Sequence, residues 1–321
     1  MRTTTLWIEA PDVVRLRRGV LEDPSDGDVL VRTRFSGISR GTEALVLAGR
    51  VPPTEHDRMR APFMQGQFPA PIAYGYISVG CVEAGPPDLL GREVFCLYPH
   101  QDRYVVPAAA VAPLPPELPA SRAVLAANME TALNVVWDAG IGPGDRIAVV
   151  GAGVVGLLSA WLASRIPGTD VAVIDIADSR SAICAELGLA FSPPHAAPQD
   201  CDVVIHASGH ESGLDTAIGC AGFEARIIEA SWHGSGQTRV PLGGAFHSRR
   251  LAIVSSQVGS IPAERRARWS YRRRLAKALD LLRDARLDAL ITGESAFADL
   301  PDHYGAILKD PNTLCHRIRY D

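Results

Sequence analysis

Three glycines carry the clearest chemical signal in the sequence. The segment GAGVVG places Gly151, Gly153 and Gly156 in the spacing G-x-G-x-x-G, after the β-branched run RIAVV and before the apolar run LLSAWLASRI. In such a strand–turn–helix unit the first glycine permits the turn, the second lets the backbone approach a pyrophosphate, and the third lets the helix pack on the strand. The helix begins with Val154 and Val155, whose free N–H groups and positive dipole end favour the same anionic group.

An acidic residue completes this pattern. Asp175 closes the second predicted strand, VAVIDI, 19 residues beyond Gly156. A carboxylate at this place accepts hydrogen bonds from the ribose hydroxyls of the adenosine. Strand, spacing and acid together predict dinucleotide binding, whereas a glycine turn alone would not. The carboxylate would repel a 2′-phosphate, so NAD is predicted over NADP, although Arg180 could swing towards a phosphate.

The elements that must position this turn follow from the order of the chain. Beyond the proline-rich stretch PLPPELPA, a helix over 120–139 and the runs CDVVIHAS, ARIIEASW and RLAIVSSQVG alternate with helical patterns. This order predicts an α/β fold with a doubly wound parallel sheet. Before it, short strand-like runs separated by Gly, Pro and Asp predict a strand-rich domain, in which the polar segment 49–71 is a long loop that could cover a cleft.

Bulk properties exclude several classes of protein. The 321 residues carry a net charge of −4, which argues against a nucleic-acid surface. No apolar run has the length of a signal peptide or a membrane span, so we expect a cytoplasmic protein without a membrane partner. The six cysteines lack C-x-x-C spacing, as expected of reduced thiols.

One segment near the C-terminus is strongly basic. It either binds an anionic partner or forms the solvated face of an amphipathic helix, and the second reading is favoured because Leu275, Ala278, Leu281 and Leu282 recur at helical spacing. The arginines concerned are Arg265, Arg266, Arg268, Arg272, Arg273 and Arg274.

A resemblance to a known family emerges from these motifs taken in order. SGISRGTE, GYISVG, RYVVPA, METALN, VVGAGVVG and VIDI together resemble the medium-chain dehydrogenase/reductase superfamily, over nearly the whole chain. SGISRGTE followed by GRVPP is most similar to its bacteriochlorophyllide dehydrogenase group. The resemblance implies a GroES-like catalytic domain over 1–118, a Rossmann domain over 119–263, and a return of 264–321 to the catalytic domain.

The sequence departs from the zinc-dependent members of this superfamily. Those members use Cys, His and Cys as catalytic ligands. The resemblance places Ser39 at the first position, with Arg40 as an alternative alignment, Tyr76 at the second and Ala127 at the third. The four-cysteine structural zinc lobe is absent. We therefore expect no metal site.

Without a metal, hydrogen-bond donors must polarise the substrate carbonyl and move its proton. Tyr76 and Ser39 are the first candidates because the resemblance places them on the cleft wall, although Tyr76 could instead be a packing aromatic. Thr42 matches the relay threonine of the family's GTD motif, and Glu43 matches its acid in a mainly structural role. His100 could line the cleft as a proton donor or acceptor.

Further residues are candidates for cofactor contact. Arg40 could neutralise the pyrophosphate, and Asn128 could contact the nicotinamide or the substrate. Ser208 and Ser231 follow two parallel strands at their carboxyl ends, where ligands of open α/β sheets bind. The LAIVSSQVG strand would be the edge through which two sheets join in a homodimer.

The sequence thus predicts a zinc-independent oxidoreductase that transfers a hydride between NAD(H) and a small-molecule secondary alcohol or ketone. Two alternatives remain open. One is a quinone or enoyl reductase, which acts on a conjugated C=C bond. The other is a nucleotide-binding partner protein without catalysis.

Overall fold

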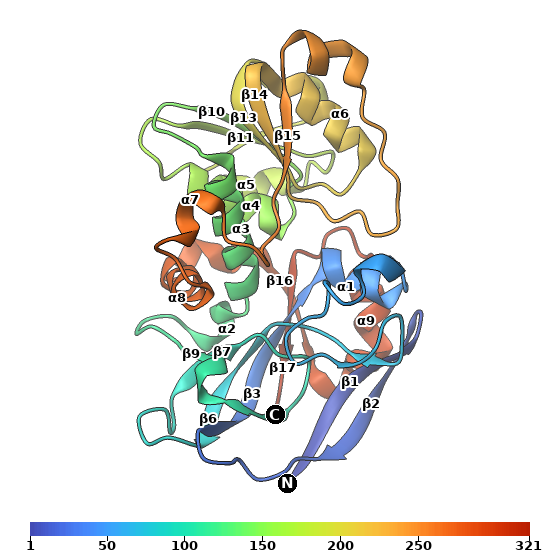
Figure 1. The fold of residues 1–321 in the computed structure, drawn as a ribbon, viewed down its shortest axis with the longest axis vertical. Coiled ribbons are helices and arrows are strands. Elements are labelled where there is room, and N and C mark those ends of the chain that lie inside the picture. Colours follow the sequence, from blue (N-terminus) through green and yellow to red (C-terminus); the bar gives the residue numbers. More distant parts are fainter. The chain divides into compact units, whose positions relative to one another are not determined.

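The computed structural model describes residues 1–321, which form two compact units. One comprises Met1–Ala127 and Leu275–Asp321, and the other comprises Asn128–Arg274 (Figure 1). The sequence placed these divisions after residues 118 and 263, whereas the units divide after 127 and 274. Arg274, the last residue of the second unit, is ion-paired with Glu130 of the same unit.

The first unit contains the predicted strand-rich domain. Its larger sheet has the order β16-β17-β3-β6-β7-β9, with β8 also paired to β3. The C-terminal strand β17 runs antiparallel to β3 and pairs Cys315 with Ser39, so the end of the chain does return to this sheet. The strands are β3 (Asp28–Ser39), β6 (Ser78–Ala84), β7 (Glu93–Cys96), β8 (Arg103–Pro107), β9 (Val111–Pro113), β16 (Ile291–Ala296) and β17 (Cys315–Arg319).

A second sheet of this unit has the order β2-β1-β5-β4. Its strands are β1 (Arg2–Ala10), β2 (Val13–Val20), β4 (Gln65–Gly66) and β5 (Ile72–Ala73). The long polar segment therefore contributes a short hairpin, and it buries Met64 and Phe68 in the unit. Sequence reasoning missed β2, and it missed helix α1 (Arg40–Leu47), which forms where only a loop motif was predicted.

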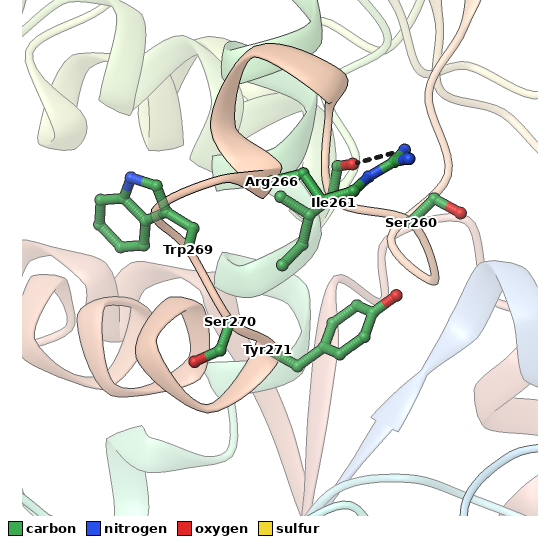
Figure 2. A pocket seen from close by; sticks show the side chains of 6 residues that line it. All are labelled: Ser260, Ile261, Arg266, Trp269, Ser270 and Tyr271. Carbon is green, nitrogen blue, oxygen red and sulfur yellow. Dashed lines mark hydrogen bonds between the residues drawn. The ribbon is translucent and has the colours of Figure 1, made fainter.

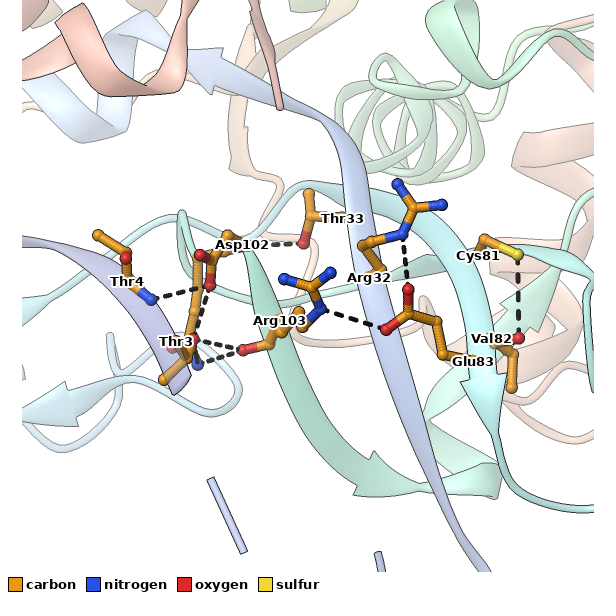
Figure 3. A network of polar contacts seen from close by, with 10 residues as sticks. Thr3, Thr4, Arg32, Thr33, Cys81, Val82, Glu83, Asp102 and Arg103 are labelled. Carbon is orange, nitrogen blue, oxygen red and sulfur yellow. Dashed lines mark hydrogen bonds and ion pairs between the residues drawn. The ribbon is translucent and has the colours of Figure 1, made fainter. Parts of the chain in front are cut away.

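Side-chain contacts join the two sheets of the first unit (Figure 3). The Asp102 carboxylate accepts hydrogen bonds from Thr3 Oγ1 and from the Thr4 N–H, both at 2.8 Å. The Glu83 carboxylate accepts from Arg32 Nε at 2.7 Å and from Arg103 Nε at 3.2 Å. Asp102 thus links β1 to the residue before β8.

The second unit confirms the predicted doubly wound fold. Its six strands have the order β12-β11-β10-β13-β14-β15, and every pairing is parallel. The strand before the glycines, β10, therefore lies inside the sheet. The strands are β10 (Arg146–Val150), β11 (Asp170–Ile174), β12 (Ala190–Ser192), β13 (Cys201–His206), β14 (Ala221–Glu229) and β15 (Ala252–Ser255).

Apolar helices connect these strands. Nine of the ten residues of α4 (Val154–Ala163) are buried, as the run LLSAWLASRI predicted. The predicted helix over 120–139 is interrupted at 124–125, where α2 ends. The other helices are α2 (Ala120–Ala123), α3 (Ala126–Ala139), α5 (Arg180–Leu187), α6 (Glu211–Cys220), α7 (Ala263–Arg266), α8 (Tyr271–Leu281) and α9 (Leu300–Lys309). None of the helices in the chain is long and apolar enough to span a bilayer.

The basic segment is mostly exposed, as the amphipathic reading predicted, but Arg274 is an exception. This arginine is 2% exposed, and its Nε lies 3.0 Å from Glu130 Oε1. Its two Nη atoms donate to Asn134 Oδ1 and to the Val258 carbonyl. Nearby, Trp269 and Tyr271 line a surface pocket with Ser260, Ile261, Arg266 and Ser270 (Figure 2).

Replacing Arg274 tests this correction. Burial raises the pKa of Glu130 more than Arg274 lowers it, so Arg274→Ala would leave a poorly compensated carboxyl group in the interior. We expect a loss of about 3–5 kcal/mol in the free energy of unfolding, measured by urea denaturation. The matched control Arg272→Ala removes an exposed guanidinium and should change this free energy by less than about 0.5 kcal/mol. Equal effects of the two replacements would contradict the assignment.

Candidate cofactor and catalytic sites

The three glycines of the turn have the separate roles that the sequence predicted. Gly151 has φ +110°, and a Cβ built there would lie 2.6 Å from the Ser208 backbone nitrogen. A Cβ on Gly156 would lie 2.0 Å from the Gly151 carbonyl oxygen. Gly153 begins α4, and a Cβ on it would have no neighbour within 4 Å. The chain itself therefore requires the first and third glycines, while the second leaves open space at the start of the helix.

Asp175 lies beside this turn. It follows β11 by one residue rather than closing the strand. Its Oδ2 accepts the Ala152 N–H at 2.7 Å, and its Oδ1 accepts the Ala177 N–H at 2.9 Å. A half-buried carboxylate at the glycine turn supplies acceptors for ribose hydroxyls. These residues, with the open space at Gly153, fit an adenine dinucleotide.

The other predicted cofactor residues of this unit differ in position and burial: two follow strands at their carboxyl ends, and others lie in the interior. Ser208 and Ser231 follow β13 and β14 at their carboxyl ends, and the Gly209 N–H donates to Ser231 Oγ at 3.0 Å. Val155 is half-buried. Asn128 and Arg180 are 2% and 5% exposed, so Arg180 lies in the interior rather than on a surface from which it could swing towards a phosphate. Val154 is also buried.

In the first unit, a buried carboxylate gathers polar groups from three segments. Glu43 Oε1 accepts the Ser39 N–H at 2.7 Å. Its Oε2 accepts the Tyr304 hydroxyl at 2.6 Å and lies 3.0 Å from His100 Nε2. Glu43, His100 and Tyr304 are all 0% exposed. We call Ser39, Glu43, His100 and Tyr304 the Glu43 cluster. In this cluster Glu43 has a structural role, as the resemblance implied.

The position of His100 corrects one expectation. Sequence reasoning placed this imidazole on a cleft wall, but the structure places it in the interior with both ring nitrogens engaged. Nδ1 lies 2.9 Å from Ser36 Oγ, which in turn lies 2.9 Å from the Tyr320 hydroxyl. The physical reason is the buried Glu43 carboxylate, which needs donors around it.

Tyr76 precedes β6 and is half-buried. Its hydroxyl lies close to those of Ser39 and Thr42, the latter on α1, which begins at the half-buried Arg40. Burial and, to a smaller extent, the charge of Glu43 raise the pKa of Tyr76 to about 12. At neutral pH this side chain is therefore a neutral phenol that can donate a proton. The structure thus brings Ser39, Thr42 and Tyr76 together.

The residues at the family's zinc positions do not fit that metal. Ser39 offers a hydroxyl, Tyr76 a protonated phenol and Ala127 only a methyl group. Zinc in proteins is held by thiolate, imidazole or carboxylate groups. These three side chains therefore do not support a metal-dependent reaction step.

Sequence reasoning missed two groups of polar residues. Tyr304 and Tyr320 join the Glu43 cluster and Ser36 from the far end of the chain, and no local motif marks them. His206, Glu229 and His233 lie together in the second unit. A signal for these three existed, because HASGH and EASWHG end neighbouring strands.

Comparisons with known proteins agree with this architecture. No protein-family model matches the chain. It is similar to D-guloside 3-dehydrogenase of Escherichia coli K12, with 24% identity over 308 residues that cover 86% of this chain and 88% of that protein. It is also similar to 2-desacetyl-2-hydroxyethyl bacteriochlorophyllide A dehydrogenase of Rhodobacter capsulatus, with 27% identity over 335 residues that cover 98% and 97%.

A solved structure covers the same length. The NADP-bound structure of a protein assigned as a zinc-binding dehydrogenase from Sinorhizobium meliloti 1021 has a TM-score of 0.79 at 17% identity, over 99% of both chains. The fold is that of the medium-chain dehydrogenases. The resemblance of this chain to the medium-chain dehydrogenase/reductase superfamily is thereby confirmed, and the names of the curated relatives support an oxidoreductase.

The different roles of the glycines give a paired prediction. Gly153→Ala should leave the melting temperature nearly unchanged, because its Cβ meets no atom, but should weaken NADH binding at least about tenfold by occupying the approach to the pyrophosphate. Gly156→Ala should lower the melting temperature, because its Cβ meets the Gly151 carbonyl. Thermal unfolding and NADH fluorescence titration measure the two effects. Unchanged NADH affinity in Gly153→Ala would place the cofactor elsewhere.

Proposed function

We propose that the protein is an NAD(H)-dependent dehydrogenase that interconverts a secondary alcohol and a ketone without a catalytic zinc ion. The observation that carries this proposal is the proximity of the Tyr76 phenol to the hydroxyls of Ser39 and Thr42. The resemblance places Ser39 and Tyr76 at two of the positions where zinc-dependent members of the superfamily have metal ligands. The named activities of the two relatives support alcohol chemistry.

The proposed chemistry assigns a task to each residue. A nicotinamide, when bound, would supply the hydride acceptor or donor. Tyr76 would donate its proton to the substrate oxygen as a ketone is reduced, and it would take that proton back as an alcohol is oxidised. The hydroxyls of Ser39 and Thr42 orient the phenol and can relay a proton to it. The Glu43 cluster fixes the backbone of Ser39.

The proposed substrate is a secondary alcohol on a molecule larger than a simple alcohol. The two relatives are named for a glycoside and for a hydroxyethyl-bearing bacteriochlorophyllide, and a hydroxyethyl group carries a secondary alcohol. We further propose a cytoplasmic homodimer joined through β15. This strand ends the sheet order and pairs only with β14, so its other edge is open to a second copy.

Removing the phenol oxygen tests the assignment of Tyr76. A positioned acid or base contributes ~10²–10⁴ in rate, so Tyr76→Phe should lower kcat for ketone reduction at least about tenfold while NADH binding is unchanged. Because the raised pKa of about 12 keeps the phenol protonated, its ionisation should not reduce this rate between pH 7 and about pH 10. Steady-state kinetics on carbonyl, alcohol and quinone panels provide the measurement.

The control is Tyr74→Phe, the same change two residues away, which should leave kcat within about twofold. All assays use chelator-treated protein, and loss of activity on chelation would contradict zinc independence. Near wild-type turnover in both Tyr76→Phe and Ser39→Ala would rule out hydroxyl donation by these residues. Turnover of quinones alone would favour the reductase alternative, and cofactor binding without turnover of any panel member would favour the non-catalytic one.

The choice of cofactor depends on Asp175. This carboxylate beside the glycine turn would repel a 2′-phosphate, so we expect tighter binding of NADH than of NADPH. Asp175→Ser should shift the ratio of the two dissociation constants towards NADPH at least about tenfold, or about 1.4 kcal/mol. The control Asp178→Ser removes an exposed carboxylate three residues away and should leave the ratio unchanged. Equal affinities for the two cofactors in the wild type, unaltered by Asp175→Ser, would refute the assignment.

A further inference from the structure

Three potential metal ligands converge at the carboxyl ends of two neighbouring strands in the second unit. His206 ends β13 and pairs in register with Glu229, which ends β14, while His233 lies in the segment that follows. His206 Nδ1 lies 2.6 Å from Glu229 Oε2, and His233 Nε2 lies 3.8 Å from the same oxygen. One donor atom from each residue falls within 4.8 Å of the other two.

The remaining polar atom of each residue has its own partner. His206 Nε2 lies 2.7 Å from Ser208 Oγ, and His233 Nδ1 lies 3.2 Å from Thr238 Oγ1. Glu229 Oε1 accepts the Ser231 N–H at 2.8 Å. Metal-binding imidazoles and carboxylates are oriented by such outer hydrogen bonds. All three ligand atoms are thus held facing a common point.

We propose that His206, Glu229 and His233 form a binding site for a divalent transition-metal ion, with Zn²⁺ as the best match. Two imidazoles and a carboxylate suit Zn²⁺, and they leave a fourth position for water. With metal–ligand bonds of about 2.0–2.2 Å, tetrahedral ligand atoms lie about 3.3–3.5 Å apart, and the two distances to Glu229 Oε2 fall on either side of that value.

Access to this site is from one side. The side chains of Glu229 and His233 are 17% and 22% exposed, whereas that of His206 is fully buried. An ion would therefore approach past Glu229 and His233, and water would complete its coordination.

A hydrogen-bonded pair of His206 and Glu229 explains only part of this arrangement. It accounts for the 2.6 Å separation but not for His233, whose Nε2 is too far from Oε2 at 3.8 Å for a direct hydrogen bond. An ion between the three atoms would give His233 Nε2 a partner, and it would replace the hydrogen bond between His206 and Glu229. All three residues belong to the second unit, and the site shares no residue with Ser39, Tyr76 and Ala127.

The site adjoins the nucleotide turn. The Ser208 backbone nitrogen is the atom that a Cβ on Gly151 would meet at 2.6 Å, and Ser208 Oγ contacts His206. A bound ion would fix the segments after β13 and β14 to each other beside that turn. We therefore expect it to stabilise the fold rather than to take part in hydride transfer.

The experiment is a titration of chelator-stripped, dialysed protein with Zn²⁺ and Co²⁺. We expect saturation at one ion per chain, a Co²⁺ absorption spectrum of low coordination number, and a rise in melting temperature on addition of Zn²⁺. His233→Ala and Glu229→Gln should weaken Zn²⁺ binding at least about tenfold and abolish this rise. The control His210→Ala removes an exposed imidazole from the same segment as Ser208 and should bind as the wild type does.

Absence of saturable binding, or equal affinities in all variants, would overturn the proposal. Circular dichroism of the metal-free variants shows whether they are folded, and the fully buried His206 is left intact so that folding is preserved. Neither failure affects the proposed dehydrogenase, because its assays are made in chelator. Conversely, loss of hydride transfer on chelation, with Zn²⁺ binding still dependent on His233, would refute zinc independence and leave this site standing.

Discussion

The first unit depends on the solvation of one buried charge. A carboxylate in the interior is costly unless donors surround it, and Glu43 receives the Ser39 N–H, the Tyr304 hydroxyl and a close contact from His100. These donors come from the end of β3, from helix α9 and from the segment before β8. The C-terminal part of the chain therefore helps to stabilise the buried Glu43 carboxylate, because it supplies the Tyr304 hydroxyl as a donor. Ser39, whose hydroxyl lies close to the Tyr76 phenol, donates its backbone N–H to this carboxylate, so the geometry of the proposed acid depends on it.

In the second unit the dominant constraint is steric. The close approach of Gly156 to the Gly151 carbonyl allows α4 to begin directly after β10, which lies inside the sheet with β11 and β13 on either side. Parallel strands end at one edge, so the glycine turn, Asp175, Ser208 and Ser231 are gathered there by topology alone. The same edge brings His206 next to Glu229. A parallel sheet that satisfies the steric demands of the turn thus also concentrates polar side chains where a ligand can reach them.

Much of this architecture was predictable because its signals are local. Three local patterns within 18 residues predict this unit: RIAVV predicts β10, the glycine spacing predicts the turn, and the apolar run predicts α4. The structure has each element where it was expected. The Glu43 cluster was only partly predictable, since Glu43 and Tyr304 are separated by 261 positions in sequence and no pattern joins them. Arg274 was misplaced because helical spacing identifies an apolar face but cannot reveal that an arginine on that helix meets a buried carboxyl group on α3. His100 was misplaced for the same reason, because its partner is distant in sequence.

In the proposed reaction, a phenol would take the part that a zinc ion has in metal-dependent enzymes. A zinc ion stabilises an alkoxide directly and so helps an alcohol lose its proton at neutral pH. A phenol with a pKa of about 12 is ionised in only about one molecule in 10⁵ at pH 7, so as a base it is almost never in the required form. The protonated form, which an acid requires, is present in nearly every molecule at pH 7. Burial, with the help of the Glu43 charge, holds the phenol in its protonated state. The raised pKa therefore keeps the phenol in the form that ketone reduction requires, but it does not make the phenol a stronger acid.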